Sequence, residues 1–223
     1  MGYTTDFLLL MTKHDGDLVA DGTAIDLGLA GATLCDLVEM GRLDLDKEGK
    51  IAVLDSSPTG SGALDEAARR FTDKAGKKAG NALPKVAKDL RDSVYGELQV
   101  QGAVVRQDFK TLGIFARHRW PIQDESRMFE LRRMVLGALE RPEFVEARLA
   151  GLISLVSATD TVKQVTQDLE STFSTRDLKK NAKAIAEGDL EGAAVNRAIQ
   201  DVQAVVSAAV MVAVTTTVIT GSG

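Results

Sequence analysis

The chain has 223 residues, of which 44% are hydrophobic and 26% charged, and its formal net charge at pH 7 is −5. This composition predicts a globular protein with one sizeable core or two small ones. Aromatic residues make up only 4% of the chain, and Ala, Val and Leu supply most of its apolar mass, which favours packed helices over a sandwich of strands. The single cysteine, Cys35, excludes an intrachain disulfide, fits a reducing cytoplasm and is expected to be buried.

The first expected elements are short. Residues 6–11 form an apolar element, Asp15-Gly16 a turn, and residues 18–20 a brief strand. No positively charged segment accompanies the apolar one, so nothing indicates export.

A helix that runs directly into a hairpin is predicted next. Leucines recur at helical spacing from Leu29 to Leu37, and Gly41 is placed to end the helix. The pattern then changes to period two, with residues 43–45 facing residues 51–53 across a turn at Gly49. A loop at 56–62, a helix at 64–71 and a Gly-rich basic loop at 74–80 follow.

A second unit of this kind is predicted from Leu83 onward. One apolar stripe runs from Leu83 to Leu98 and predicts a single helix that ends near Gly102. A hairpin follows, with strands at 103–107 and 112–116 and a turn at 108–111. On the predicted helix three basic residues step by three, which places them together on one face away from the apolar stripe: Lys85, Lys88 and Arg91.

The second half of the chain is expected to be helical. Breaks at Pro142, Ser174 and Gly188 divide it into helices at 125–139, 143–158, 160–169, 175–187 and 189–217. The uncharged end, from residue 202, is short of the about 20 predominantly apolar residues that span a membrane, and we expect the central helix of a bundle there. No linker of disordered composition divides the chain, so residues 1–223 are expected to form one domain that is mostly α-helical, with two short hairpins.

Sequence motifs for catalysis are absent. There is no paired cysteine, metal-binding histidine spacing, nucleophile elbow or phosphate-binding Gly-Lys-Ser/Thr pattern, and His14 and His118 are expected at the surface. The loop Ser57-Pro-Thr-Gly-Ser-Gly62 has the small residues of a phosphate cradle without its lysine. We therefore expect no enzyme, no cofactor and no metal ion.

Charge is distributed unevenly along the sequence. Between Lys77 and Arg133 there are 12 Lys and Arg against 7 Asp and Glu, so this segment carries +5 and the rest of the chain −10. Gathered on one side of the fold, these basic residues would attract an anionic surface. The alternative is that they are ordinary solubilising charges at helical spacing.

The order of these features resembles the Golgi phosphoprotein 3 family of peripheral membrane proteins. The segments that carry the resemblance are Gly28-Leu-Ala-Gly31 through Leu45, Pro58-Thr-Gly60 with Leu64-Asp-Glu-Ala67, and the helix, Gly102 and hairpin followed by Trp120-Pro121. The resemblance implies a helical domain with a central bundle and a protruding hairpin that takes part in oligomerisation. The hairpin residues concerned are Arg106, Phe109, Leu112 and Ile114.

The resemblance also implies a ligand. Eukaryotic members bind phosphatidylinositol 4-phosphate on the cytosolic face of the Golgi and act as adaptors that retain glycosyltransferases. Their headgroup pocket uses a tryptophan and three arginines, and alignment places Asp21, Ala30, Lys88 and Arg91 at these positions. The charge of the arginine pair is kept at Lys88 and Arg91, whereas the tryptophan and the first arginine are lost.

We therefore expect a cytoplasmic protein, peripheral to the membrane, that binds anionic phospholipids and has protein clients and copies of itself as partners. The expected headgroup residues are Lys88, Arg91, Lys85, Arg117 and Arg119. One alternative is a winged-helix-like nucleic-acid-binding protein with residues 30–40 as recognition helix, although the acidic total and few basic residues there argue against nucleic acid. Another is an oligomeric scaffold without lipid binding.

Overall fold

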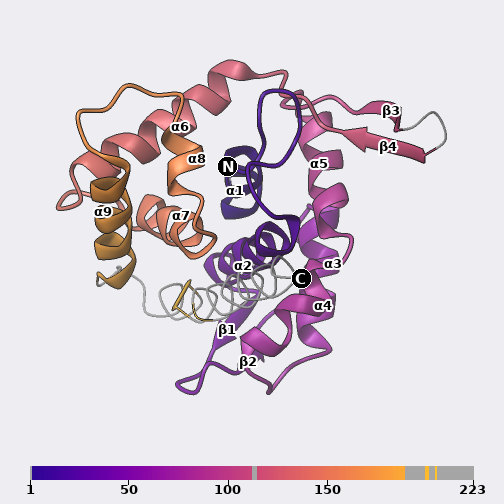
Figure 1. Cartoon of the computed structure of the whole chain (residues 1–223). Coiled ribbons are helices and arrows are strands. Elements are labelled where there is room, and N and C mark those ends of the chain that lie inside the picture. The colour runs from indigo at the N-terminus through magenta and orange to yellow at the C-terminus, as the bar shows by residue number, and fades with distance from the viewer. Residues whose placement is uncertain (1, 112–114, 189–198, 201–203, 205–223) are drawn as a thin grey trace, which may run out of the picture.

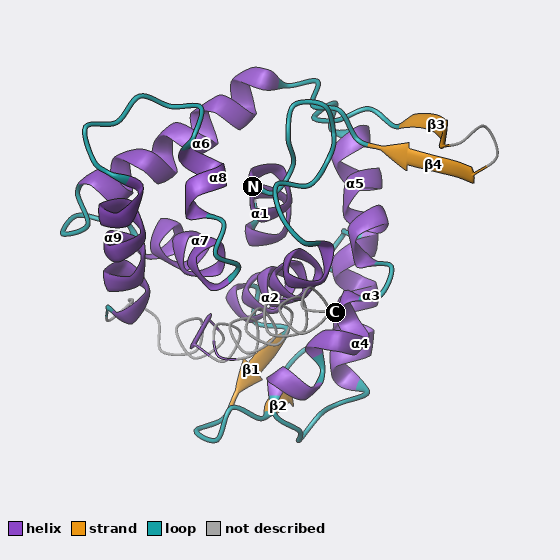
Figure 2. Cartoon of the chain, in the orientation of Figure 1, coloured by secondary structure: helices purple, strands orange, loops and turns teal. Residues whose placement is uncertain are grey.

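The computed structural model describes residues 2–111, 115–188, 199, 200 and 204. This part of the chain is mostly helical, as expected, with two small antiparallel sheets of two strands (Figures 1 and 2). The helices are α1 (Tyr3–Leu10), α2 (Gly22–Glu39), α3 (Gly62–Thr72), the 3-10 helix η1 (Ala79–Asn81), α4 (Leu83–Ala87), α5 (Leu90–Val100), α6 (Glu125–Glu140), α7 (Ala147–Ala158), α8 (Val162–Thr166) and α9 (Thr175–Glu187). The strands are β1 (Leu43–Leu45), β2 (Ile51–Val53), β3 (Gln107–Thr111) and β4 (Phe115–Arg119).

Helix α2 lies at the centre of the described structure and contacts α1, α3, α4, α5 and α7 (Figure 1). Every residue from Ala30 to Val38 is buried, and Cys35 is buried as expected. A helix enclosed in this way cannot enter a DNA groove, so residues 30–40 do not form a recognition helix. Gly28 allows the close packing, since a Cβ there would lie 2.6 Å from Cζ of Phe7 and 2.9 Å from Cγ2 of Thr159.

The first helix-to-hairpin unit is confirmed. After α2 the chain turns at Gly41, whose φ of 67° favours glycine. Gly41 N–H donates to the Val38 carbonyl at 2.9 Å and Arg42 N–H to the Leu37 carbonyl at 2.8 Å, which is the Schellman pattern of helix ends. In the hairpin Leu43 pairs with Val53 and Leu45 with Ile51, around a left-handed Gly49.

The single helix expected from Leu83 to about Gly102 is wrong, because the structure breaks it into α4 and α5. Lys88 has φ −62° and ψ 124°, and Asp89 has φ 60° and ψ 3°, the backbone of a type II turn. Aspartate is one of the few residues that tolerate this left-handed conformation. Lys85, Lys88 and Arg91 therefore do not share one helix face. The end of α5 at Gly102 is as expected and repeats the Schellman pattern of α2.

The second hairpin exists, but its first strand lies four residues and its second strand three residues later than expected. Gln107 pairs with Arg119 and Thr111 with Phe115, so residues 108–111 belong to β3 and not to a turn. The apolar residues at 103–107 suggested a strand of the hairpin. Ala103 and Val104 instead pack into the core, and Val104 forms a β-bridge with Ile122. The hairpin projects away from the helices (Figure 1).

The remaining elements agree with the sequence in part. The helices α6 and α9 fall where expected, whereas α7 begins only after a turn at 141–144 and α8 is shorter than 160–169. The strand expected at 18–20 is a single bridge from Leu18 to Thr12. The helix expected at 189–217 lies largely outside the described residues. Within the described part, no helix is both long and apolar enough to cross a membrane.

One cluster of buried apolar side chains includes residues from all nine described α-helices. A buried carboxylate also joins distant elements: Asp6 of α1 lies 3.8 Å from Nη2 of Arg127 on α6 and 3.5 Å from Nη2 of Arg148 on α7. The first and second halves of the chain thus share one interior. That residues 1–223 form one domain stays a prediction.

Candidate functional site

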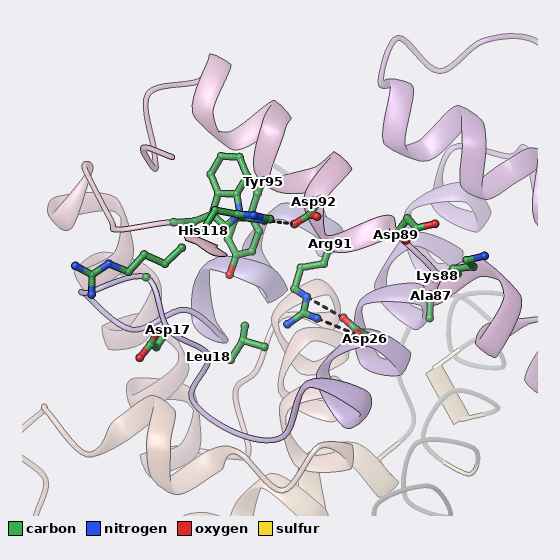
Figure 3. Close-up of a pocket in the computed structure, with 13 residues that line it drawn as sticks. Asp17, Leu18, Asp26, Ala87, Lys88, Asp89, Arg91, Asp92, Tyr95 and His118 are labelled. Atoms are coloured by element: carbon green, nitrogen blue, oxygen red, sulfur yellow. Dashed lines mark hydrogen bonds and ion pairs between the residues drawn. The ribbon is translucent and has the colours of Figure 1, made fainter. Parts of the chain in front are cut away.

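A surface pocket of about 480 Å³ opens between four segments that are far apart in the sequence (Figure 3). Its walls come from the loop between α1 and α2, from α2 itself, from the turn between α4 and α5 with the first turns of α5, and from the end of β4. The lining residues are Gly16, Asp17, Leu18, Asp26, Ala87, Lys88, Asp89, Arg91, Asp92, Tyr95, His118, Arg119 and Trp120.

The N-terminus of α5 forms part of the pocket wall. The turn at Lys88 and Asp89 directs the chain into α5, and the Asp89 side chain does not cap the helix. The first backbone N–H groups of a helix carry partial positive charge and attract anions. Lys88 is exposed beside them, and its amino group forms no ion pair with a described residue. The N-terminus of α5 and the exposed Lys88, which has no ion pair among the described residues, therefore belong to one wall.

Arg91 lies in the middle of the pocket and is neutralised by α2. Its Nε lies 3.1 Å from Oδ1 of Asp26, and its Nη2 donates a hydrogen bond of 3.2 Å to Oδ2 of the same carboxylate (Figure 3). Burial raises the pKa of Asp26, and the nearby Arg91 opposes that rise. This pair positions the arginine, and the negative charge of Asp26 reduces the attraction of Arg91 for an anionic ligand.

Aromatic side chains form another part of the pocket wall: Tyr95, Trp120 and His118. Trp120 is only 7% exposed and stacks on Tyr95, with ring centroids 5.2 Å apart and planes 13° apart. The Tyr95 hydroxyl lies 2.7 Å from Oγ1 of Thr12, and burial raises the Tyr95 pKa to about 12. His118 meets Trp120 edge-on, and its Nε2 lies 3.1 Å from Oδ1 of Asp92. Trp120 thus both packs in the core and lines the pocket.

The loop between α1 and α2 is fixed against this wall. Gly16 has φ 89°, and a Cβ there would lie 2.4 Å from the backbone nitrogen of Pro121. The Ile122 N–H donates to the His14 carbonyl at 3.1 Å, which continues the contact. Only glycine allows such a close approach of two backbones. The pocket rim at Asp17 and Leu18 is positioned by these contacts.

The expected headgroup residues are only partly brought together. Lys88, Arg91 and Arg119 line the pocket, whereas Lys85 and Arg117 do not. Lys85 instead forms an ion pair of 2.7 Å with Asp73. Arg119 donates to Oε1 of Gln107 at 2.8 Å and lies over the Phe109 ring.

The remaining positions named from the sequence that the structure describes lie outside the pocket. Asp21 caps α2 by accepting the Thr23 N–H at 2.9 Å, and Ala30 is fully buried, so neither lines the pocket. On the hairpin, Arg106 pairs with Asp108 at 3.0 Å and Phe109 is 40% exposed. Leu112 and Ile114 lie outside the described residues.

The carboxylates of the pocket were missed from the sequence: Asp17, Asp26, Asp89 and Asp92. Asp89 gave no signal, because the apolar stripe of the predicted helix continues on both sides of it. The Arg91–Asp26 pair joins residues 65 positions apart and gave none. Among the described residues, no three His, Cys, Asp or Glu side chains gather in a way that could hold a metal ion.

The features of this fold, a helical core with two helix-to-hairpin units and a charged surface pocket beside the second hairpin, define the class of protein. The chain belongs to the Golgi phosphoprotein 3 (GPP34) family, whose model matches residues 4–202. The resemblance inferred from the segments at 28–45 and 58–67 is thereby confirmed. No match was found among curated proteins.

Proposed function

We propose that this protein is a non-enzymatic peripheral membrane protein of the cytoplasm that binds anionic lipid headgroups in the pocket at the N-terminus of α5. The observation that carries the proposal is that the start of α5, which has no side-chain cap, and Lys88, which forms no ion pair with any described residue, line the same pocket. Membership of the Golgi phosphoprotein 3 family supports a role at a lipid surface.

The proposed binding is weak and sensitive to salt. A basic side chain near an anionic leaflet contributes roughly 1 kcal/mol, and this attraction falls off within a Debye length. In the pocket Lys88 and Arg119 form no ion pair with a described residue, while Arg91 is already paired with Asp26. Few free cations therefore act on a headgroup, and the helix end adds to them.

Co-sedimentation with liposomes tests the proposal. Wild type should sediment with vesicles that contain an anionic lipid and not with purely zwitterionic vesicles, and added salt should release it. The double variant Lys88→Ala/Arg91→Ala should lose most of this binding, because it removes two cations from one wall of the pocket. Lys47→Ala is the matched control, since Lys47 is exposed in the turn of the first hairpin and lines no part of this pocket.

Circular dichroism should show that both variants keep the helix content of the wild type. The proposed function is wrong if wild type sediments no better with anionic than with zwitterionic vesicles and the double variant sediments to the same extent as wild type.

We further propose that the second hairpin joins copies of this chain and so supports an adaptor role toward protein clients. The hairpin projects from the body (Figure 1). Phe109, which lies on it, is 40% exposed. Light scattering should give a smaller particle mass for Phe109→Asp than for wild type. Val100→Asp serves as control, because Val100 is 91% exposed and lies outside the hairpin. An unchanged mass for Phe109→Asp would count against self-association through the hairpin.

A further inference from the structure

We infer that Lys50 and Lys78 form a second anion site, which binds a phosphomonoester group between their two amino groups. The site is separate from the pocket beside α5, because no residue of 46–50 or 74–78 lines that pocket. In Figure 1 the strands β1 and β2 lie at the bottom, whereas β4, whose end lines the pocket, lies at the upper right. Binding at the two lysines does not depend on the lipid binding proposed for the pocket.

Backbone hydrogen bonds hold the two lysines directly opposite each other. The loop after α3 runs antiparallel to β2, and an isolated β-bridge joins Lys50 to Lys78. Two bonds of 3.0 Å flank this bridge, from the Ile51 N–H to the Lys77 carbonyl and from the Ala79 N–H to the Gly49 carbonyl. The lysines are therefore a non-hydrogen-bonded antiparallel pair. In such a pair the Cα atoms lie only about 4.5 Å apart and both side chains leave the same face.

The charge around the pair is positive and uncompensated. Residues 46–50 and 74–78 contain five Lys against one Asp and one Glu, so the two segments carry +3. None of the five lysines forms an ion pair with a described residue. The aspartate, Asp46, uses Oδ1 to accept the N–H groups of Glu48 at 2.9 Å and of Lys50 at 2.8 Å. Its carboxylate thus supports the hairpin turn and forms no ion pair with Lys50 or Lys78.

Two like charges directly opposite each other on neighbouring strands reduce stability. An anion between the two amino groups replaces this repulsion with two attractions. A phosphomonoester carries up to two negative charges near neutral pH and has three acceptor oxygens, and each lysine offers three N–H donors. A phosphodiester carries a single charge. The pair therefore matches a phosphomonoester in charge and is expected to bind it more tightly than a phosphodiester.

A titration followed by NMR tests the site residue by residue. The probes are inorganic phosphate, which is mostly a dianion at about pH 8, and the monoanion dimethyl phosphate at equal ionic strength. In wild type the backbone amide signals of residues 49–51 and 77–79 should shift and saturate with inorganic phosphate, and dimethyl phosphate should bind more weakly. The variant Lys88→Ala/Arg91→Ala should give the same shifts, because it changes only the pocket beside α5.

Two variants of the pair separate charge from side-chain shape. Lys50→Gln/Lys78→Gln should weaken phosphate binding at these signals by about tenfold or more, because charge-assisted hydrogen bonds are lost. Lys50→Arg/Lys78→Arg keeps both positive charges and should keep the binding. Lys13→Gln/Lys163→Gln is the matched control, since it removes two exposed lysines that lie elsewhere and have no ion pair with a described residue. This control should bind phosphate as wild type does.

A second arm identifies the source of the phosphate group. Phosphatidylcholine vesicles that contain phosphatidic acid present a phosphomonoester at a lipid surface, and vesicles with phosphatidylglycerol at equal lipid charge present a phosphodiester. Saturating shifts with inorganic phosphate that the Gln variant lacks support a site for soluble phosphomonoesters. A preference for phosphatidic acid that the Gln variant alone loses supports a site for a lipid phosphate.

The site is refuted if the Gln variant matches the Lys13→Gln/Lys163→Gln control in both arms, or if dimethyl phosphate binds wild type as tightly as inorganic phosphate. Either result leaves the lipid binding proposed for the pocket untouched, because that binding is tested by Lys88→Ala/Arg91→Ala.

Discussion

Tyr95 supports the aromatic wall of the pocket from within the core. It is 2% exposed, it stacks on Trp120, and its hydroxyl lies 2.7 Å from Oγ1 of Thr12. Thr12 Oγ1 in turn lies 2.6 Å from the Leu8 carbonyl, to which it donates. Burial of the phenol disfavours its charged form and raises its pKa to about 12.

Stability should therefore fall at high pH through Tyr95. In the unfolded chain a tyrosine loses its proton near pH 10, whereas Tyr95 in the native state holds it to about pH 12. Between these values the native state binds more protons than the unfolded state, so the free energy of unfolding decreases as pH rises. The loss is about 2–3 kcal/mol from this residue.

Urea unfolding from pH 9 to pH 12 measures this effect. Because other groups titrate in the same range, the comparison is between wild type and Tyr95→Phe, and the wild-type curve should fall more steeply. Parallel curves would show that Tyr95 titrates normally in the folded protein.

At the scale of elements, the same helix-to-hairpin connection occurs twice in the chain. Both α2 and α5 end in a Schellman turn at a left-handed glycine and continue into a hairpin. Both glycines, Gly41 and Gly102, were readable in the sequence, because the apolar helical period stops there. The turn at Lys88 and Asp89 could not be read from the sequence, because the apolar stripe continues on both sides of the break.

The close packing of helices around α2 depends on Gly28. A Cβ at this position would lie 2.6 Å from Cζ of Phe7 on α1, and both residues are in the core. We expect Gly28→Ala to destabilise the protein by about 1–3 kcal/mol, because the ring and the helix must shift to accept the methyl group. Chemical denaturation measures the change.

Gly137→Ala is the matched control. Gly137 lies within α6, and a Cβ there has no atom within 4 Å, so this substitution should stabilise the protein by up to about 1 kcal/mol through helix propensity. Equal effects of the two substitutions would contradict a packing role for Gly28.

At the scale of the whole molecule, the elements were more predictable than their contacts. Helical period, glycine breaks and the alternation at 43–53 identified most helices and the first hairpin. The pocket depends instead on pairs between distant residues, such as Arg91 with Asp26 and His118 with Asp92. Local patterns contain no signal for such pairs, because each residue alone reads as a solvated charge. The basic residues of the site could therefore be proposed, and its acidic residues could not.

The shared core predicts cooperative unfolding. The only tryptophan of the chain, Trp120, stacks on α5 beside the second hairpin, whereas helix content is spread from α1 to α9. If the chain is one domain, Trp120 fluorescence and far-ultraviolet circular dichroism should report the same urea midpoint. Two separated midpoints would mean that the halves unfold independently.

The pocket is assembled from a loop before α2, from α2, from the turn before α5 and from the end of β4. These walls come together only when the chain is folded, so a molecule held between them binds the native state and not the unfolded one. Such a molecule raises the melting temperature in proportion to the logarithm of its concentration once it saturates the site. Soluble headgroup fragments, glycerol phosphate and inositol phosphates among them, can therefore be ranked by melting curves alone, without a membrane.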